Sequence, residues 1–293
     1  MNLACPICGA NQWRSCYHGS IRMGPFGKQS PAEMDIWECG QCGGRHLPPL
    51  MEDLESYYRS GEYRQDLGEG NAVETYFRLT DDDQPHKLAW LGMHKLRGKI
   101  IADIGAGAGP FLDLVRGVVA QTIAVEPNQN YHESLRQRGH LVFPSTETML
   151  KDWAGKIDAA VSFSVLEHVE NPRQFLAEIK SSLKPDGWLA ISTPNADDLM
   201  VEISRDYAGF FYRKVHLWYF RAPALQALAK LAGFAQCEIH FEHRFDLSNA
   251  LVWLRDKRPS GLGTIPLDGA MDAAWRHALI STGRSDYIYA ILH

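Results

Sequence analysis

The sequence lacks the features of a protein that crosses a membrane or enters a secretion pathway. No apolar run in its 293 residues approaches the roughly 18 residues that a membrane-spanning helix needs. The first residues, Met1 to Pro6, have neither the basic flank nor the apolar core of a secretion signal. An excess of positive charge is also missing: the net charge is −5, which supplies no overall attraction to nucleic acid. We therefore expect a cytoplasmic protein without a membrane partner; the charge does not exclude a nucleic-acid partner but gives it no support.

Cysteine is missing between residues 43 and 236, and five of the six cysteines lie in the first 42 residues. Two Cys-x-x-Cys pairs, each followed by glycine, can place four thiolates tetrahedrally around Zn²⁺. The predicted ligands are Cys5, Cys8, Cys39 and Cys42. A site with four cysteines has no open position, so we expect a structural ion. Cys16 and His46 could each replace one ligand, and two thiol pairs without metal are the alternative.

The rest of the chain divides into two further regions after this zinc-ribbon-like module over residues 1–50. Residues 51–97 are predicted to form a helical linker or lid, with helices over Met51 to Tyr58 and Glu74 to Leu96. From residue 98 to 293, apolar strand-like runs alternate with helix-like runs, which favours an α/β fold with a mostly parallel sheet. The predicted strands are Ile100–Ile104, Thr122–Val125, Ala159–Phe163, Trp188–Ser192, Ala235–Phe241 and Tyr287–Leu292.

A glycine-rich turn follows the first of these strands. Glycines at 105, 107 and 109 allow the backbone to turn sharply and to approach a ligand that side chains would exclude. Asp103 stands near the end of the strand, and the next strand ends at Glu126, where a carboxylate can accept both hydroxyls of a ribose. A nicotinamide dehydrogenase is the competing interpretation, but its Gly-x-Gly-x-x-Gly fingerprint differs from these alternate glycines.

These motifs resemble those of class I S-adenosylmethionine-dependent methyltransferases, and the resemblance covers roughly residues 72–293. It implies a Rossmann-like, mostly parallel sheet of seven strands flanked by helices. It also implies that the glycine-rich turn wraps the methionine part of the cofactor, that Glu126 binds its ribose, and that the turn beginning at Pro144 contacts its adenine. Asp186 stands where the family usually has glycine in the turn before the fifth strand. The cofactor-binding residues implied by the resemblance are Asp103, Gly105, Ala106, Gly107, Gly109, Glu126, Pro127, Thr146, Glu147, Ser162, Phe163 and Ser164.

Three residues are candidates for acid–base chemistry on a methyl acceptor. Methyl transfer is an in-line displacement, so the enzyme supplies alignment and, for a hydroxyl acceptor, a base. His168 and His216 are candidate bases, because a neutral imidazole suits this task near pH 7. Glu167 is a candidate for orienting one of them. The structural alternatives are a turn beside the cofactor for His168 and packing against Trp218 for His216.

Two aromatic and basic clusters are candidates for shaping the acceptor pocket. Arg213 and Lys214 follow an aromatic run and could meet a phosphate or carboxylate on the acceptor, or could simply be a solvated face. A second cluster lies in the predicted lid and comprises Tyr57, Tyr58, Arg59, Tyr63 and Arg64.

The leading hypothesis is O- or C-methylation of a small molecule, with a sugar or sugar nucleotide as the first candidate. The second is an RNA methyltransferase whose zinc ribbon grips RNA. Against it, residues 1–50 hold only four permanent cations, and Ser162 to Val165 stand where amine-directed nucleic-acid enzymes carry Asn/Asp-Pro-Pro-Tyr/Phe. The third is a non-catalytic cofactor-binding protein, which the intact glycine turn and Glu126 disfavour. The sequence determines neither the acceptor nor the oligomeric state.

Overall fold

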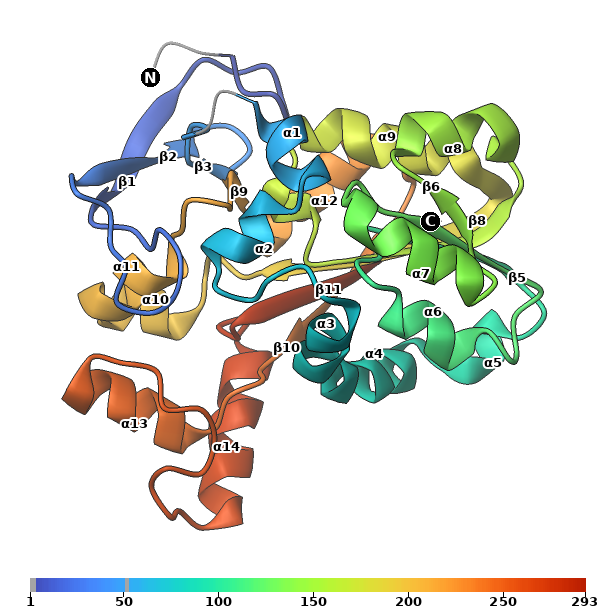
Figure 1. Ribbon diagram of the computed structural model, residues 1–293. Helices are drawn as coiled ribbons and strands as arrows, with labels where there is room; N and C mark the ends of the chain where they lie inside the picture. The colour runs from blue at the N-terminus through green and yellow to red at the C-terminus, as the bar shows by residue number, and fades with distance from the viewer. Residues whose placement is uncertain (1–3, 51–52) are drawn as a thin grey trace.

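The computed structural model describes residues 4–50 and 53–293, and its largest element is a sheet of seven strands (Figure 1). The strand order is β10-β11-β8-β7-β4-β5-β6, and the strands β4 to β8 run parallel to one another. Only β11 is antiparallel to both of its neighbours. The predicted α/β class and mostly parallel sheet are confirmed. The strands are β4 (Ile100–Ile104), β5 (Gln121–Val125), β6 (Leu141–Phe143), β7 (Ile157–Phe163), β8 (Leu183–Pro194), β10 (Cys237–Glu242) and β11 (Tyr287–Leu292).

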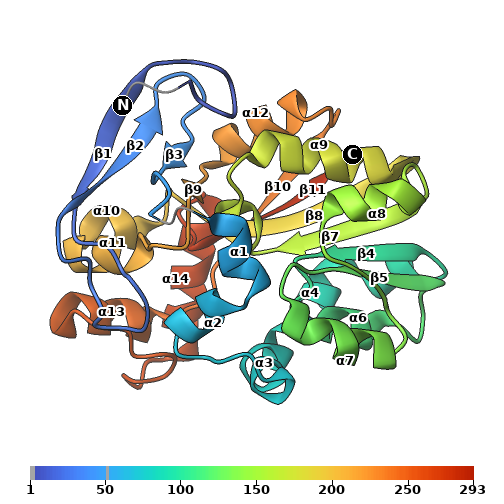
Figure 2. The same cartoon turned by 45° about the horizontal axis from the view of Figure 1, so that its top comes forward.

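Helices cover both faces of this sheet, because its central strands are apolar on both sides (Figure 2). One face packs against α8 (Thr146–Trp153), α9 (Pro172–Ser182) and α12 (Ala222–Leu231). The other face packs against helices from the segment before β4 and from the glycine-rich turn. These are α4 (Gln84–Leu91), α5 (Met93–Leu96) and α6 (Pro110–Val115), while α7 (His132–Gln137) lies beside α6.

Two parts of the sheet region differ from the prediction. The turn expected before the fifth strand lies inside the range of β8, where pairing with β7 jumps from Leu183 to Trp188 and the residues between them bulge. The helix α14 (Gly269–Ser281) was not anticipated; its N-cap Asp268 accepts a hydrogen bond from the backbone of Ala270. It follows the helix α13 (Leu247–Asp256), and both project from the sheet edge beyond β10 (Figure 1).

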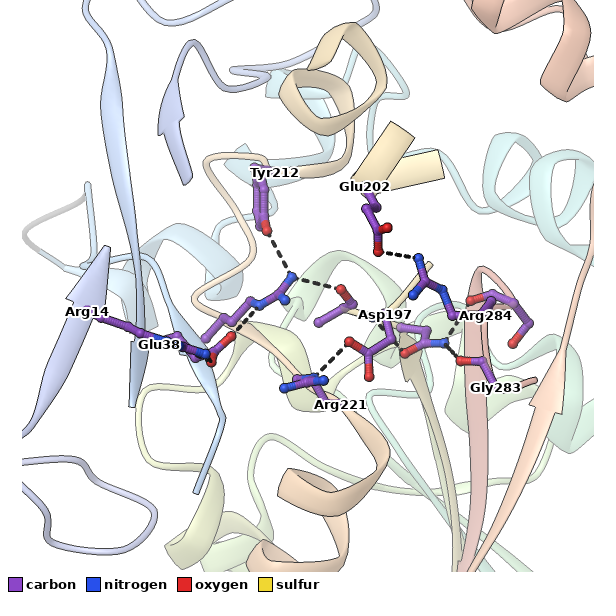
Figure 3. A network of polar contacts seen from close by, with 12 residues as sticks. Arg14, Glu38, Asp197, Glu202, Tyr212, Arg221, Gly283 and Arg284 are labelled. Atoms are coloured by element: carbon purple, nitrogen blue, oxygen red, sulfur yellow. Dashed lines mark hydrogen bonds and ion pairs between the residues drawn. The ribbon is translucent and has the colours of Figure 1, made fainter. Parts of the chain in front are cut away.

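The N-terminal module shares a second sheet with the rest of the chain. Its strands β1 (Trp13–Gly19), β2 (Met34–Cys39) and β3 (Arg45–His46) are joined by β9 (Trp218–Tyr219), which lies 172 residues after β3. Arg45 strengthens this junction: its guanidinium pairs with Glu38 and donates to the carbonyl oxygen of Ala196 and to the Tyr212 hydroxyl (Figure 3). The module therefore packs directly onto the segment that holds His216.

The predicted lid consists of several short helices instead of two longer ones. They are α1 (Leu54–Arg59), α2 (Glu62–Asp66), α3 (Val73–Thr80) and the 3₁₀ turn η1 (Asp81–Asp83), followed by α4 and α5. Gly92, at φ 83°, separates α4 from α5, so the expected continuous helix from Glu74 to Leu96 was wrong. The predicted start at Met51 lies outside the described residues. Within residues 4–50 and 53–293, no helix has the length and apolar character needed to span a membrane.

Candidate functional site

A cavity of about 730 Å³ lies at the carboxyl ends of β4, β5, β6 and β7. Its floor includes the residues that follow these strands, and its other walls come from the lid. This is the edge at which open α/β sheets bind their ligands, and the volume lies within the range of small-molecule sites. The strands and the lid helices therefore enclose a site of suitable size for a nucleoside-sized cofactor with a small acceptor.

The glycine-rich turn forms one wall of this cavity. Gly105 and Gly107 have φ values of 82° and 56°, a left-handed conformation that favours glycine. A Cβ on Gly105 would lie 2.3 Å from Val165, and one on Gly107 would lie 2.1 Å from the hydroxyl of Tyr76. The absence of side chains thus lets the turn pack closely beneath α3 and against the segment after β7.

Glu126 is fixed by the same turn. Its carboxylate accepts hydrogen bonds from the backbone N–H of Gly107 at 2.6 Å and of Asn128 at 2.8 Å. Burial raises the pKa of the carboxyl, while these two N–H donors lower it. Because a carboxylate offers about four acceptor positions, two remain for a ligand after these bonds are made. The carboxylate is held in the cavity wall and can still bind a diol.

Asp103 lies behind the turn and faces a lysine from the lid. Burial raises the pKa of Asp103 to about 7, and the nearby Lys87 ammonium opposes this shift. Lys87 lines the cavity from α4, and its own pKa is lowered by burial. Its Nζ lies 5.2 Å from the centre of the Phe163 ring. Lys87 had no sequence signal, because a lysine on an amphipathic helix usually faces solvent.

The structure separates the sequence-predicted cofactor residues into two sets. Those that line the cavity are Gly105, Gly107, Glu126, Pro127, Thr146, Phe163 and Ser164. The others support the wall from outside it or lie at the surface: Asp103, Ala106, Gly109, Glu147 and Ser162. Ser162, for example, donates to the carbonyl oxygen of Ile104 at 3.0 Å and ties β7 to β4. Glu147 is exposed on the first turn of α8.

His168 lines the cavity at its other end, on the 3₁₀ turn η3 (Leu166–His168). Its Nδ1 lies 2.8 Å from the carbonyl oxygen of Val215, which can only accept, so Nδ1 carries the proton. The Tyr58 hydroxyl lies 2.8 Å from the same nitrogen and donates to the same carbonyl at 3.3 Å. Burial, followed by the charge of Arg213, lowers the pKa of His168 to about 3. The imidazole is therefore neutral, with Nε2 able to accept a hydrogen bond.

Glu167 and His216 lie behind His168 and do not line the cavity. The His168 and His216 rings are perpendicular, with their centres 4.7 Å apart. Arg213 donates from Nε to Nε2 of His216 at 2.8 Å, which places the His216 proton on Nδ1. Among the described residues, neither this Nδ1 nor either carboxylate oxygen of Glu167 has a hydrogen-bond partner. Burial raises the pKa of Glu167 to about 7. The structure thus brings all three predicted acid–base residues together.

Two groups of side chains in the described parts of the chain have metal-ligand spacing. The first comprises the four predicted cysteines, with sulfur–sulfur distances of 3.7 Å for Cys5–Cys42 and 3.6 Å for Cys8–Cys39. Tetrahedral zinc with bonds near 2.3 Å requires about 3.8 Å between sulfurs. The two sequence alternatives lie outside this group: Cys16 bonds the carbonyl oxygen of Ile36, and His46 the carbonyl oxygen of Leu217.

The second group consists of Glu167, His168 and His216, whose ligand atoms lie within 4.8 Å of one another. It suits a metal ion less well. Arg213 already occupies one nitrogen of His216, and His168 Nδ1 is bonded to a carbonyl oxygen. A divalent ion here would stand beside a permanent guanidinium charge with one carboxylate for compensation, which is costly in a buried site. The group is better suited to binding and moving protons.

Comparison with known proteins agrees with this geometry. A family model described as a methyltransferase domain matches residues 82–238. A ubiquinone biosynthesis O-methyltransferase of Paracidovorax citrulli is 28% identical over 142 residues, covering 42% of this chain and 56% of the relative. An uncharacterized 37.1 kDa protein in a transposon of Streptomyces fradiae is 31% identical over 171 residues, covering 53% of this chain and 49% of that protein. The chain thus spans about half the length of these curated relatives.

Solved structures share the fold at low sequence identity. A SAM-dependent methyltransferase from Archaeoglobus fulgidus aligns with a TM-score of 0.53 and 17% identity, covering 75% of this chain and 96% of that one. A phosphoethanolamine N-methyltransferase of Haemonchus contortus, in complex with S-adenosylmethionine, aligns with a TM-score of 0.51 and 12% identity, covering 83% of this chain and 60% of that one. Since the family model spans more than half of the sequence and the fold agrees, the chain belongs to the methyltransferase domain family.

Proposed function

We propose that this protein transfers a methyl group from S-adenosylmethionine to a small-molecule acceptor. One observation carries the proposal: a side-chain-free turn at Gly105 and Gly107 stands beside the fixed carboxylate of Glu126, in a cavity large enough for both reactants. A ribose diol can use the free acceptor positions of Glu126, and the backbone of the turn lines the same cavity, where the methionine part can approach it. Family membership supports the same activity.

The chemistry supplied by the bound cofactor is a methyl group already activated by the positive sulfonium. The chain supplies alignment and a place for the acceptor's proton. His168 Nε2 accepts a hydrogen bond from the acceptor hydroxyl, because the Nδ1 proton is fixed toward Val215. Since the pKa of His168 is only about 3, a proton on Nε2 needs a compensating charge, and ionised Glu167, whose oxygen lies within 4.8 Å, supplies it. Glu167 acts as a positioning residue through this charge, since it does not line the cavity.

A sugar or sugar nucleotide, methylated on oxygen or carbon, is our proposed acceptor class. The support is indirect: the acceptor end of the cavity combines the tyrosines Tyr58 and Tyr63 with polar groups, as a hydroxylated ligand requires. A relative that is similar over 42% of this chain is named as an O-methyltransferase of ubiquinone biosynthesis, which supports methylation on oxygen.

We also propose that the four cysteines of the N-terminal module hold one structural zinc ion per chain. The sulfur–sulfur distances fit a tetrahedral site, and Gly9 and Gly43 give each Cys-x-x-Cys turn its left-handed residue, at φ 78° and 72°. Cys5 and Cys39 belong to the same apolar core as Leu217 and Trp218. Zinc would therefore stabilise the wall behind the acceptor end as well as the module.

A binding and transfer experiment tests the proposal. Calorimetry should detect S-adenosylhomocysteine binding at one site per chain. A tritiated-methyl screen across sugar nucleotides, small phenols and total RNA should place label in a small-molecule fraction. Label in the RNA fraction would favour the nucleic-acid alternative, and cofactor binding without label in any fraction would favour a non-catalytic protein. No cofactor binding at all would refute the assignment of the cavity.

A further inference from the structure

A second, smaller hollow lies between the N-terminal module, the lid and the segment before β9. Three of its lining residues are basic: Arg22 comes from the module, and Arg213 and Lys214 precede His216. One is acidic, Asp66 at the end of α2. Its volume is about 10 Å³, which is room for about one water-sized group. The hollow can therefore admit an oxygen atom of a ligand but not the ligand's whole body.

The positive charge of this hollow is not compensated by the protein. Lys214 pairs with Asp66 at 2.8 Å. By contrast, no carboxylate within residues 4–50 and 53–293 forms an ion pair with Arg22 or with Arg213, and the buried Nε of Arg22 has no hydrogen-bond partner there. Buried guanidinium groups are normally paired. The two guanidinium groups thus lack an ion pair, because the carboxylates whose charge they feel, Glu69 for Arg22 and Glu167 for Arg213, lie beyond ion-pair distance.

Other half-buried arginines of this protein follow the usual rule. Arg64 pairs with Glu69, Arg138 with Asp113, and Arg276 with Asp272. Arg22 and Arg213, which have no acidic partner, are therefore a local exception within a fold that elsewhere supplies an acid to each half-buried arginine. A local exception of this kind is the usual mark of a ligand site, because the missing partner is expected from outside the chain.

The backbone forces the two arginines together despite their repulsion. Arg22 donates from its N–H to the carbonyl oxygen of Tyr212 at 2.9 Å, and its own carbonyl oxygen accepts from Lys214 at 2.9 Å. Through these bonds Arg22 and Arg213 form an isolated parallel β-bridge and lie side by side. The guanidinium of Arg22 also lies over the Phe210 ring, with 4.1 Å from Cζ to the ring centre. Two like charges, one of them stacked, are held ready for an anion.

We propose that Arg22 and Arg213 form an oxyanion site that binds a phosphate or carboxylate group from outside the chain. Packed side chains separate this site from the main cavity, because no residue lines both, and two contacts link its residues to His168. Arg213 donates to His216, whose ring packs against His168. Val215 lines the hollow, and its carbonyl oxygen holds Nδ1 of His168. An anion held here lies behind the residues that position His168, so the inference is independent of which acceptor the main cavity binds.

Binding of inorganic phosphate, measured by calorimetry at constant ionic strength, tests this site. Arg22→Gln should weaken phosphate binding at least tenfold, since a charge-assisted bidentate contact is lost. Arg205→Gln is the matched control, because Arg205 is exposed on α11 (Arg205–Phe211) of the same face and should leave phosphate affinity unchanged. A parallel titration with acetate distinguishes a site for phosphate from one for carboxylate.

Two further measurements separate this inference from the proposed function and from misfolding. S-adenosylhomocysteine affinity should be equal in wild type and Arg22→Gln, and the melting temperature of Arg22→Gln should not fall, because repulsion from Arg213 is relieved. Equal phosphate affinity in Arg22→Gln and wild type would overturn the oxyanion site, as would binding of phosphate and acetate no tighter than chloride. Failure of S-adenosylhomocysteine to bind any variant would instead overturn the proposed function alone.

Discussion

The two ends of the main cavity are built in different ways. The fixed parts of the cofactor end, which are strand β4, the glycine-rich turn and Glu126 after strand β5, come from one short stretch of chain, and the hydrogen bonds of Glu126 are made within it. The acceptor end is assembled from the lid, the turn η3 and the segment before β9, with the N-terminal module behind it. It leaves buried polar atoms of Glu167 and His216 without partners among the described residues.

This difference concerns how each end is stabilised before any ligand binds. A partnered, locally encoded cofactor end holds its shape before any ligand binds. An acceptor end with unsatisfied polar groups is less stable than it could be, and such a cost is usually tolerated only where a ligand supplies the partners. Variants in the two ends should therefore affect different measurements. Three variants test whether the two ends behave independently.

The largest effect is expected from loss of the zinc site. Cys39→Ser removes one of four ligands and should lower the free energy of unfolding by about 3 kcal/mol or more, since a structural zinc site contributes directly to folding. Zinc content should fall from about one to near zero, while S-adenosylhomocysteine affinity should fall less than tenfold, because the cofactor end is local. Thermal unfolding, metal analysis and calorimetry measure these changes.

Cys16→Ser is the matched control for the zinc variant, because Cys16 is an exposed thiol outside the four-cysteine group. It should keep both zinc and stability. Wild-type protein without zinc would refute the metal site, and a Cys39→Ser protein that loses cofactor affinity as strongly as stability would show that the two ends are not independent.

The next effect concerns Glu167 and pH. Glu167→Gln should lower turnover about 100-fold, the lower range for acid–base assistance, and leave cofactor affinity nearly unchanged. In wild type, turnover should rise with pH through about 7, because the raised pKa of Glu167 makes its carboxylate appear there. The variant should lack this rise. A pH–rate profile with the acceptor identified in the screen measures both, and an unchanged profile would remove Glu167 from the proton step.

The same carboxyl gives a readout that needs no acceptor. The pKa of Glu167 is raised in the fold from 4.5 to about 7, so the neutral form stabilises the protein fully below pH 4.5. This contribution is lost as the pH rises through about 7. Glu167→Gln should therefore flatten the fall in melting temperature between pH 5 and pH 8, and an equally steep fall in the variant would assign it to Asp103, whose pKa is also about 7.

The smallest effect is expected at the cofactor end. Glu126→Gln should weaken S-adenosylhomocysteine binding by about 1–3 kcal/mol, the range for a lost charge-assisted hydrogen bond. Glu147→Gln, at an exposed position that the sequence grouped with the cofactor residues, should have no effect. Calorimetry on both proteins separates the two carboxylates, and an effect at Glu147 in place of Glu126 would mean that the cofactor lies elsewhere.

Much of the cofactor end could be predicted because its parts are close in sequence. The glycines at 105 and 107 and the acid at 126 lie on consecutive strand ends, and parallel strands bring consecutive ends together. The broken lid could not be predicted, because Gly92 interrupts a helical pattern that is otherwise continuous. The position of Lys87 in the cavity also had no signal, since it depends on how α4 packs against β4 and β7.

The sequence by itself determined the strand–turn–helix unit, the four-cysteine set and the nature of the fold, since each depends on spacing within a short stretch of chain. Only the tertiary structure decided that Arg22 lies beside Arg213, that His168 and His216 meet, and that the module and the core share one sheet. These contacts join segments up to 191 residues apart, counting from Arg22 to Arg213. Which distant surfaces pack together is decided by the folding of the whole chain, and no local pattern encodes it.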